Sequence, residues 1–136
     1  MNIAQLSAQL VIDEGVKLKP YRDTVGKLTV GIGRNLDDVG ISNAEAMALL
    51  ANDIANVSAK LDANLPWWRN MTDARQQALS NMTFNMGIGT VLTFKQTLGL
   101  MQSGMYAAAA DAMLQSKWAS QVGARAQRIA MQMRNG

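Results

Sequence analysis

EGVKLKPYRDTVGKLTVGIG, residues 14–33, is the stretch that decides the fold of this chain. It holds Glu14 at the end of an expected helix, Asp23 just before an expected turn, and Thr29 in the strand that follows. Glutamate occurs only at positions 14 and 45, and the chain contains no histidine and no cysteine. Any proton chemistry of this protein must therefore run through carboxyl groups.

A helix is expected before this stretch, because Ile3, Leu6, Leu10 and Glu14 recur at three- and four-residue steps and share one face. Gly15 then stands where a helix C-terminus needs a left-handed residue. Apolar surroundings and the negative end of the helix dipole both disfavour the ionised form of Glu14. This setting fits a general acid, and the plainer alternative is a solvated helix end or an ion-pair partner of an arginine.

A hairpin of two short strands is expected next, with its turn at residues 24–27. Pro20 argues against a helix here. In the second strand apolar side chains alternate with a face that carries Thr29, Gly31 and Gly33. That face is an open floor on which a ligand could lie close to the backbone, although the glycines could equally serve a bulge or strand twist.

The rest of the chain predicts helices, so the expected class is α+β, mostly helical. Ser42 and Glu45 form a capping box, which explains Glu45 structurally and opens a long helix to about residue 62. Thr72 and Asp73 give a second helix start. Adjacent Trp67 and Trp68 are expected to pack rather than to bind a ligand. Further helices are expected at 74–86, 93–101, 105–118 and 123–133.

The composition limits the choice of function. The chain has 136 residues, which suggests one domain. No apolar run approaches the ~20 residues of a membrane span, and the N-terminus resembles neither a secretory signal nor an anchor. The absence of cysteine fits a reducing cytoplasm. A net charge of +3 points only weakly to an anionic partner.

Residues 14–33 resemble the signature of the bacteriophage-type lysozymes, also called endolysins or muramidases, of glycoside hydrolase family 24. The signature is a glutamate, eight residues, an aspartate, five residues and a threonine, and it stands here as Glu14, Asp23 and Thr29. Two further blocks, NMTFNMG at 81–87 and SKW at 116–118, also resemble the family. The surrounding signature positions that match are Gly15, Leu18, Tyr21, Thr24, Gly26, Gly31, Ile32 and Gly33.

The resemblance implies a lysozyme-like fold with a cleft between two lobes. A small β-hairpin lobe would span about 15–41, and a bridging helix would span 42–62. The larger helical lobe would consist of 64–136 together with 1–14. The link after Gly33 is short for the family, which implies a small β lobe.

The resemblance also implies an enzyme that hydrolyses the β-1,4 bond between N-acetylmuramic acid and N-acetylglucosamine in peptidoglycan. Glu14 would be the general acid. Asp23 would be the ionised carboxylate that orients water or stabilises the positive charge on the sugar, and Thr29 would help to hold that water. Two carboxyl groups in opposite protonation states are what glycosidic cleavage requires. The family leads us to expect the wider carboxylate spacing of an inverting enzyme.

Substrate contacts are expected from the family match at Gly33, Asn35, Phe84, Asn85 and Thr97. Phe84 could equally belong to the core.

Two ion pairs are also expected. Arg34 stands where the family often has a histidine, which predicts a pair between Arg34 and Asp53. Arg125 is expected as a partner of Asp13 and Glu14.

The implied partner is the glycan strand of peptidoglycan, and no nucleic acid, stable membrane anchor, cofactor or metal is expected. We expect a monomer that accumulates in the host cytoplasm. It would reach the periplasm and cell wall at lysis, released by a holin in the family's usual arrangement.

Three alternatives stay open at this point. The chain could be a non-catalytic glycan-binding module, although intact Glu14, Asp23 and Thr29 argue against this. The basic segment from Gly123 onward could form a membrane-damaging helix. A lytic transglycosylase would use one acid and leave an anhydro product.

Overall fold

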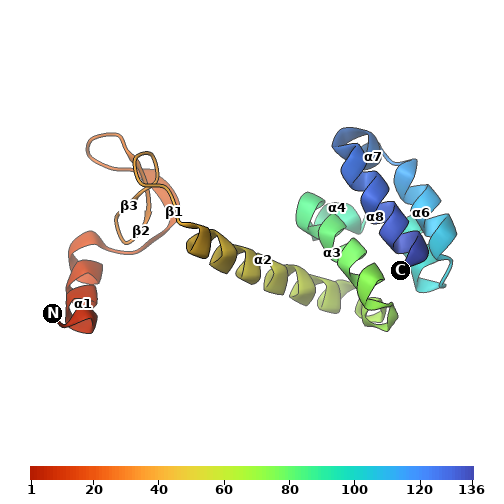
Figure 1. The fold of residues 1–136 in the computed structure, drawn as a ribbon, viewed down its shortest axis with the longest axis horizontal. Helices are drawn as coiled ribbons and strands as arrows, with labels where there is room; N and C mark the ends of the chain where they lie inside the picture. Colours follow the sequence, from red (N-terminus) through yellow and green to blue (C-terminus); the bar gives the residue numbers. More distant parts are fainter. The chain divides into compact units, whose positions relative to one another are not determined.

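The computed structural model describes residues 1–136, which divide into two compact units, Met1–Ala48 and Leu49–Gly136. The long helix α2 (Asn43–Asn64) begins in the first unit and continues into the second. Helices dominate, and the only sheet is small and antiparallel (Figure 1). This confirms the expected α+β class.

The first unit contains helix α1 (Ile3–Glu14) and the strands β1 (Lys17–Arg22), β2 (Leu28–Gly31) and β3 (Arg34–Asn35). The strands lie in the order β1-β2-β3, and each pair is antiparallel. The hairpin of β1 and β2 was predicted from sequence. The strand β3 was not, because its two residues lie in a segment whose composition suggested only a polar link.

The hairpin turn forms where the sequence predicted it. Asp23 and Lys27 close the turn through a backbone hydrogen bond of 2.9 Å from the Asp23 N–H to the Lys27 carbonyl. Gly26 has φ of 84°, a left-handed conformation that favours glycine. The pairing of β1 with β2 is irregular between Lys17 and Tyr21, and Pro20 lies in this irregular part, where its missing N–H costs no ladder hydrogen bond.

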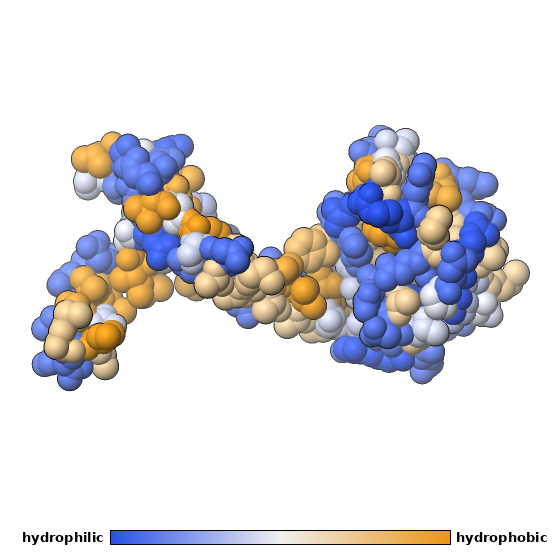
Figure 2. Space-filling view, in the orientation of Figure 1, coloured by the Kyte–Doolittle hydropathy of each residue, from blue (hydrophilic) through white to orange (hydrophobic).

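Helix α1 begins with an Asn2 cap, whose side chain accepts a hydrogen bond from the Gln5 N–H, and ends at Gly15. None of its residues is buried, so the first unit itself does not cover the expected apolar stripe. Figure 2 shows apolar surface on this helix. The predicted association of residues 1–14 with the helical part of the chain stays a prediction.

The predicted capping box at the start of α2 is confirmed. The Glu45 N–H donates to Ser42 Oγ at 3.1 Å, and the Ser42 N–H donates to Glu45 Oε1 at 3.3 Å. The other carboxylate oxygen of Glu45 accepts a 2.6 Å hydrogen bond from Arg34. Within the first unit Arg34 thus finds its partner in the first turn of α2. The predicted Arg34–Asp53 pair, which would join the two units, stays a prediction. Arg34, followed by Ser42, lowers the pKa of Glu45.

The second unit consists of the C-terminal part of α2 and a compact group of short helices. Most of the predicted boundaries hold, including the start of α3 at the Thr72 cap and its end at Gly87. The expected single helix over 105–118 is wrong: the chain breaks at Gln115 and Ser116, because the Ser116 hydroxyl caps a new helix by accepting from the Ala119 N–H. The elements are η1 (Pro66–Asn70), α3 (Asp73–Met86), α4 (Ile88–Val91), α5 (Lys95–Gln102), α6 (Tyr106–Leu114), α7 (Lys117–Val122) and α8 (Ala124–Asn135).

The hydrophobic core lies in the second unit. Its largest fully buried apolar side chains are Leu61, Leu79, Met82, Val91, Met101, Met113 and Met133. Arg75 of α3 joins two further helices, because its guanidinium donates to the carbonyls of Met133 and Arg134 at the end of α8 and stacks 3.8 Å above the ring of Tyr106. Buried Trp68 and half-buried Trp67 confirm the packing interpretation of the tryptophan pair.

Asp62, near the end of α2, fixes the segment that follows. Its Oδ1 accepts hydrogen bonds from Trp68 Nε1 and Arg69 Nε, both at 2.7 Å, and its Oδ2 accepts from Arg69 Nη2 at 3.0 Å. Arg69, followed by Trp68, lowers the pKa of Asp62 from 3.8 to about 2. These bonds hold a core tryptophan to the helix that precedes it.

We predict that Asp62→Asn makes the protein less sensitive to acid. A carboxylate whose pKa is depressed in the folded state contributes stability above its unfolded pKa of 3.8, and this contribution is lost as the pH falls toward about 2. The wild type should therefore lose more stability than the variant between about pH 5 and about pH 2. Urea unfolding followed by tryptophan fluorescence across that range measures this, and parallel curves for the two proteins would contradict it.

Candidate functional site

Glu14 is the last residue of α1, and its side chain lies against Gly33, just beyond β2. A Cβ atom at Gly33 would stand 3.1 Å from Glu14 Oε2 and 3.2 Å from its Cδ. Gly33 has φ of 71°, so glycine is favoured here by its backbone as well as by the close contact. The first unit therefore brings Glu14 onto the glycine-rich end of the second hairpin strand.

Asp23 lies at the other end of the same strand, at the hairpin turn. Its Oδ1 accepts two hydrogen bonds, from the backbone N–H groups of Val25 at 3.0 Å and Lys27 at 2.8 Å. This is the local arrangement that makes aspartate common in turns. Both bonds use one oxygen, so Oδ2 is left for a group outside this turn.

Thr29 is buried, and it is the only residue of the first unit that is. Its hydroxyl donates a 3.0 Å hydrogen bond to the Lys27 carbonyl. Asp23 and Thr29 are thus both anchored on the backbone of Lys27, one through its N–H and the other through its carbonyl. The expected open floor is partly correct: a Cβ at Gly31 would meet no atom within 4 Å, but Thr29 itself is covered.

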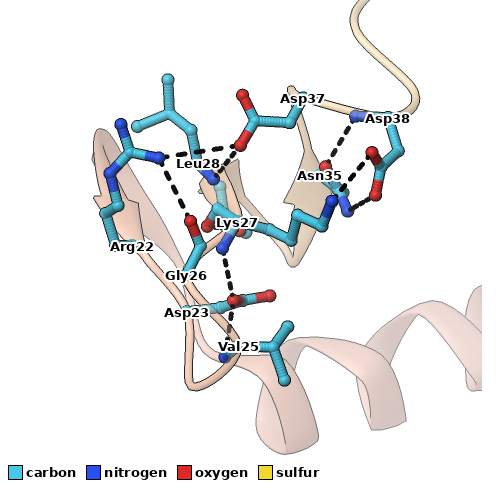
Figure 3. Close-up of polar contacts among 10 residues, drawn as sticks. Arg22, Asp23, Val25, Gly26, Lys27, Leu28, Asn35, Asp37 and Asp38 are labelled. Atoms are coloured by element: carbon cyan, nitrogen blue, oxygen red, sulfur yellow. Dashed lines mark hydrogen bonds and ion pairs between the residues drawn. The ribbon is translucent and has the colours of Figure 1, made fainter.

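Asn35, an expected substrate contact, lies in β3 beside Thr29. Its side-chain oxygen accepts from the Asp38 N–H at 2.9 Å, and its Nδ2 donates to Asp38 Oδ2 at 3.0 Å. Asp37 and Asp38 were not singled out from the sequence, although two adjacent acidic residues shortly after the signature were a visible signal. Figure 3 shows both carboxylates directed at the hairpin.

Phe84, another expected substrate contact, belongs to the second unit. It is 45% exposed and lines a pocket of about 480 Å³, so its assignment to the core is wrong. Both apolar and polar side chains line this pocket. Its lining residues are Leu50, Ile54, Val57, Trp68, Asp73, Gln76, Gln77, Ser80, Asn81, Phe84 and Arg125.

Thr97 is buried and lines a second pocket of about 460 Å³ in the same unit. Asn85 does not line this pocket. Its Oδ1 accepts a 2.8 Å hydrogen bond from Nε1 of Trp118, which does line it, and so fixes the orientation of that indole. The lining residues are Met86, Thr90, Thr93, Phe94, Lys95, Gln96, Thr97, Ser116, Lys117, Trp118 and Gln121.

Arg125 is held within the second unit by Asn81. Its Nε and Nη2 both donate to Asn81 Oδ1, at 3.1 and 2.7 Å. The predicted partnership of Arg125 with Asp13 and Glu14 stays a prediction.

No three acidic side chains gather closely enough to hold a metal ion. None of the helices has both the length and the apolar character needed to cross a bilayer.

Comparison with known proteins places the chain in a family. The family model described as phage lysozyme matches residues 12–134, which include Glu14, Asp23 and Thr29. The chain belongs to the phage lysozyme family. It is therefore a lysozyme, an enzyme of the peptidoglycan hydrolase class.

Three relatives from different organisms are similar in sequence to this enzyme. It is 30% identical to probable T4-type lysozyme 1 of Dictyostelium discoideum, over 93% of this chain and 92% of that protein. It is 34% identical to the SAR-endolysin of Escherichia phage Mu, over 77% of this chain and 60% of that protein. It is 31% identical to the pre-baseplate central spike protein Gp5 of Enterobacteria phage T4, over 88% of this chain but only 26% of that longer protein.

We predict that Gly33→Ala lowers the activity of this lysozyme more than its stability. The added Cβ would press on the Glu14 carboxyl group, and a left-handed alanine costs about 1–2 kcal/mol. Displacing an acid by a few tenths of an ångström should reduce turnover by about tenfold or more. Gly104→Ala is the matched control, since φ there is 76° and a Cβ would meet nothing within 4 Å. Equal turnover in the two variants would contradict this contact.

Proposed function

We propose that this lysozyme hydrolyses the β-1,4 bond between N-acetylmuramic acid and N-acetylglucosamine, with Glu14 as general acid and Asp23 as the ionised partner. The observation that carries the proposal is that one hairpin holds both groups. Glu14 rests on Gly33 at one end of β2, and Asp23 is bound to the Lys27 backbone at the other. The family match over both residues supports the same assignment.

The chemistry divides between the two carboxyl groups. Glu14 gives its proton to the glycosidic oxygen as the bond from that oxygen to the anomeric carbon breaks. Water attacks the anomeric carbon, and its proton passes to Asp23 or to solvent. The hydrogen bonding of Asp23 suits this role. Two backbone N–H groups already bind its Oδ1, which leaves Oδ2 to contact the water or the developing positive charge.

Thr29 is proposed to position that water. Its hydroxyl donates its hydrogen to the Lys27 carbonyl, which fixes the orientation of the hydroxyl. The Thr29 oxygen can therefore accept a hydrogen bond from the water. The shared anchor on Lys27 keeps Thr29 and Asp23 in a fixed relation to each other.

Substrate contacts are proposed at Gly33, Asn35, Phe84, Asn85 and Thr97. Exposed Phe84 offers an aromatic face of the kind that stacks on sugar rings, at the edge of an apolar pocket. Thr97 lines a pocket together with Trp118, whose indole is fixed by Asn85. Gly33 leaves backbone accessible beside Glu14.

We further propose that the enzyme acts as a phage endolysin, monomeric, which reaches the wall from the host cytoplasm at lysis with the help of a holin. The endolysins among its relatives support this role. The alternative of a membrane-damaging C-terminal helix is disfavoured by the packing of α8. Four of its apolar residues are already buried in the second unit, namely Ala126, Ile129, Ala130 and Met133, whereas Met131 is exposed.

We predict that Glu14→Gln folds and binds peptidoglycan but loses about a thousandfold or more in turnover, because an amide cannot donate a proton to the leaving oxygen. Asp23→Asn should lose at least about a hundredfold. Clearance of purified peptidoglycan measures both, and product masses should show reducing ends without an anhydro sugar.

The control is Asp111→Asn, which changes an exposed carboxylate on α6. It should retain wild-type turnover. Wild-type clearance by Glu14→Gln would overturn the assignment of the acid, and anhydro products would favour a transglycosylase.

We predict that Phe84→Ala raises KM for soluble peptidoglycan fragments by about tenfold while kcat changes little, because stacking on a sugar away from the bond contributes to binding rather than to the chemical step. Leu114→Ala is the matched control, since Leu114 is 41% exposed on α6. A fall in kcat alone would argue against this role of Phe84.

A further inference from the structure

The carboxylate of Asp23 is only as well placed as the turn that carries it. Both of its hydrogen bonds come from backbone N–H groups inside that turn, from Val25 and Lys27. The turn is exposed, and Val25 at its tip is 76% accessible. Packing therefore contributes little to its position, and whatever holds the turn from behind also sets the direction of the Asp23 carboxylate.

Asp37, in the loop after β3, binds both sides of this turn. Its Oδ2 accepts a 2.8 Å hydrogen bond from the N–H of Leu28, the first residue of β2. The same oxygen lies 3.7 Å from Nη1 of Arg22, the last residue of β1, and that Nη1 also donates to the Gly26 carbonyl at 3.1 Å. One carboxylate thus ties together the two strands that leave the turn (Figure 3).

Asp38 binds the side chain of Lys27, the residue whose backbone holds Asp23. Its Oδ1 lies 3.1 Å from Nζ of Lys27, and its position is fixed by the two hydrogen bonds that it shares with Asn35. The Lys27 side chain extends toward Asp38 and away from the Asp23 carboxylate (Figure 3). Lys27 also contacts Asp23 through its own N–H, so an ammonium released from Asp38 would have Asp23 within reach.

We propose that Asp37 and Asp38 are positioning residues for Asp23, an inference that rests on the proposed function of Asp23. Asp37 fixes the turn through the Leu28 N–H, and Asp38 keeps the Lys27 ammonium from neutralising the Asp23 carboxylate. Neither residue needs to touch the substrate.

These contacts contribute little to stability, which lets their effect on turnover be measured separately. The side chains are 67% and 43% exposed in the Arg22–Asp37 pair and 43% and 56% exposed in the Lys27–Asp38 pair. Ion pairs this exposed are screened by water and add little to the free energy of folding. Variants at Asp37 and Asp38 should therefore fold.

The role of Asp37 is tested by comparing Asp37→Ala with Asp37→Asn on soluble peptidoglycan fragments. Alanine removes the acceptor for the Leu28 N–H, so kcat should fall about tenfold or more while KM changes little. Asparagine keeps an acceptor oxygen at the same place and should restore most of kcat. A folded Asp37→Ala with wild-type kcat, or an equal loss in both variants, overturns the role of Asp37.

The role of Asp38 is tested by releasing Lys27 and then removing it. Asp38→Asn should lower kcat about tenfold, because the freed ammonium pairs with Asp23. Adding Lys27→Met to this variant should restore turnover, since no ammonium then remains. A purely structural role predicts the opposite, a second loss, and either that result or a wild-type kcat in Asp38→Asn overturns the proposal. This pair of variants decides the matter should Asp37→Ala fail to fold.

Asp111→Asn is the control, because it breaks an exposed ion pair with Arg134 in the second unit. It should keep wild-type kcat, and a loss equal to that of the loop variants would overturn the proposal. Failure of the inference is distinguishable from failure of the proposed function: Glu14→Gln and Asp23→Asn stay inactive in the first case and retain turnover in the second.

Discussion

The backbone of a single residue, Lys27, holds the centre of the candidate site together. Its N–H binds the Asp23 carboxylate, and its carbonyl accepts from both the Asp23 N–H and the Thr29 hydroxyl. Backbone groups make good anchors because their direction is set by the strand and not by a flexible side chain. Groups that are already oriented can hold a water molecule and stabilise a positive charge that develops during the reaction without having to reorganise.

The first unit holds its shape largely by polar contacts. Thr29 is its one buried residue, so the unit by itself buries little hydrophobic surface. The hairpin turn, the Asn35–Asp38 loop and the start of α2 are joined instead by hydrogen bonds and exposed ion pairs. Such contacts specify geometry while adding modest stability. Glycine is favoured at position 33 because its backbone has a positive φ and because a Cβ there would press on the Glu14 side chain.

The second unit follows the ordinary physics of a helical core. Methionine and leucine side chains fill its interior, and Arg75 and Asp62 satisfy groups at the ends of its helices. Methionine fits irregular gaps between short helices well, because it is unbranched and flexible. The same unit carries both pockets that line up with the expected substrate contacts Phe84 and Thr97.

The sequence alone predicted the features that depend on residues close together in the chain. The hairpin turn, the capping box at Ser42 and Glu45, and the helix starts at Thr72 and Gly123 depend on neighbouring residues and appear where they were expected. The family signature likewise identified Glu14, Asp23 and Thr29 as a set. The error within 105–118 arose because a serine cap competes with helix continuation, and periodicity does not register that competition.

Only the tertiary structure decided which distant groups meet. It paired Arg34 with Glu45, exposed Phe84 at a pocket, and paired Arg125 with Asn81. It also brought Asp37 and Asp38 behind the turn that carries Asp23. The physical reason is that long side chains choose partners by their positions in space, and those positions follow from the register of β3 against β2 and the packing of the helices, neither of which the spacing of residues along the chain specifies.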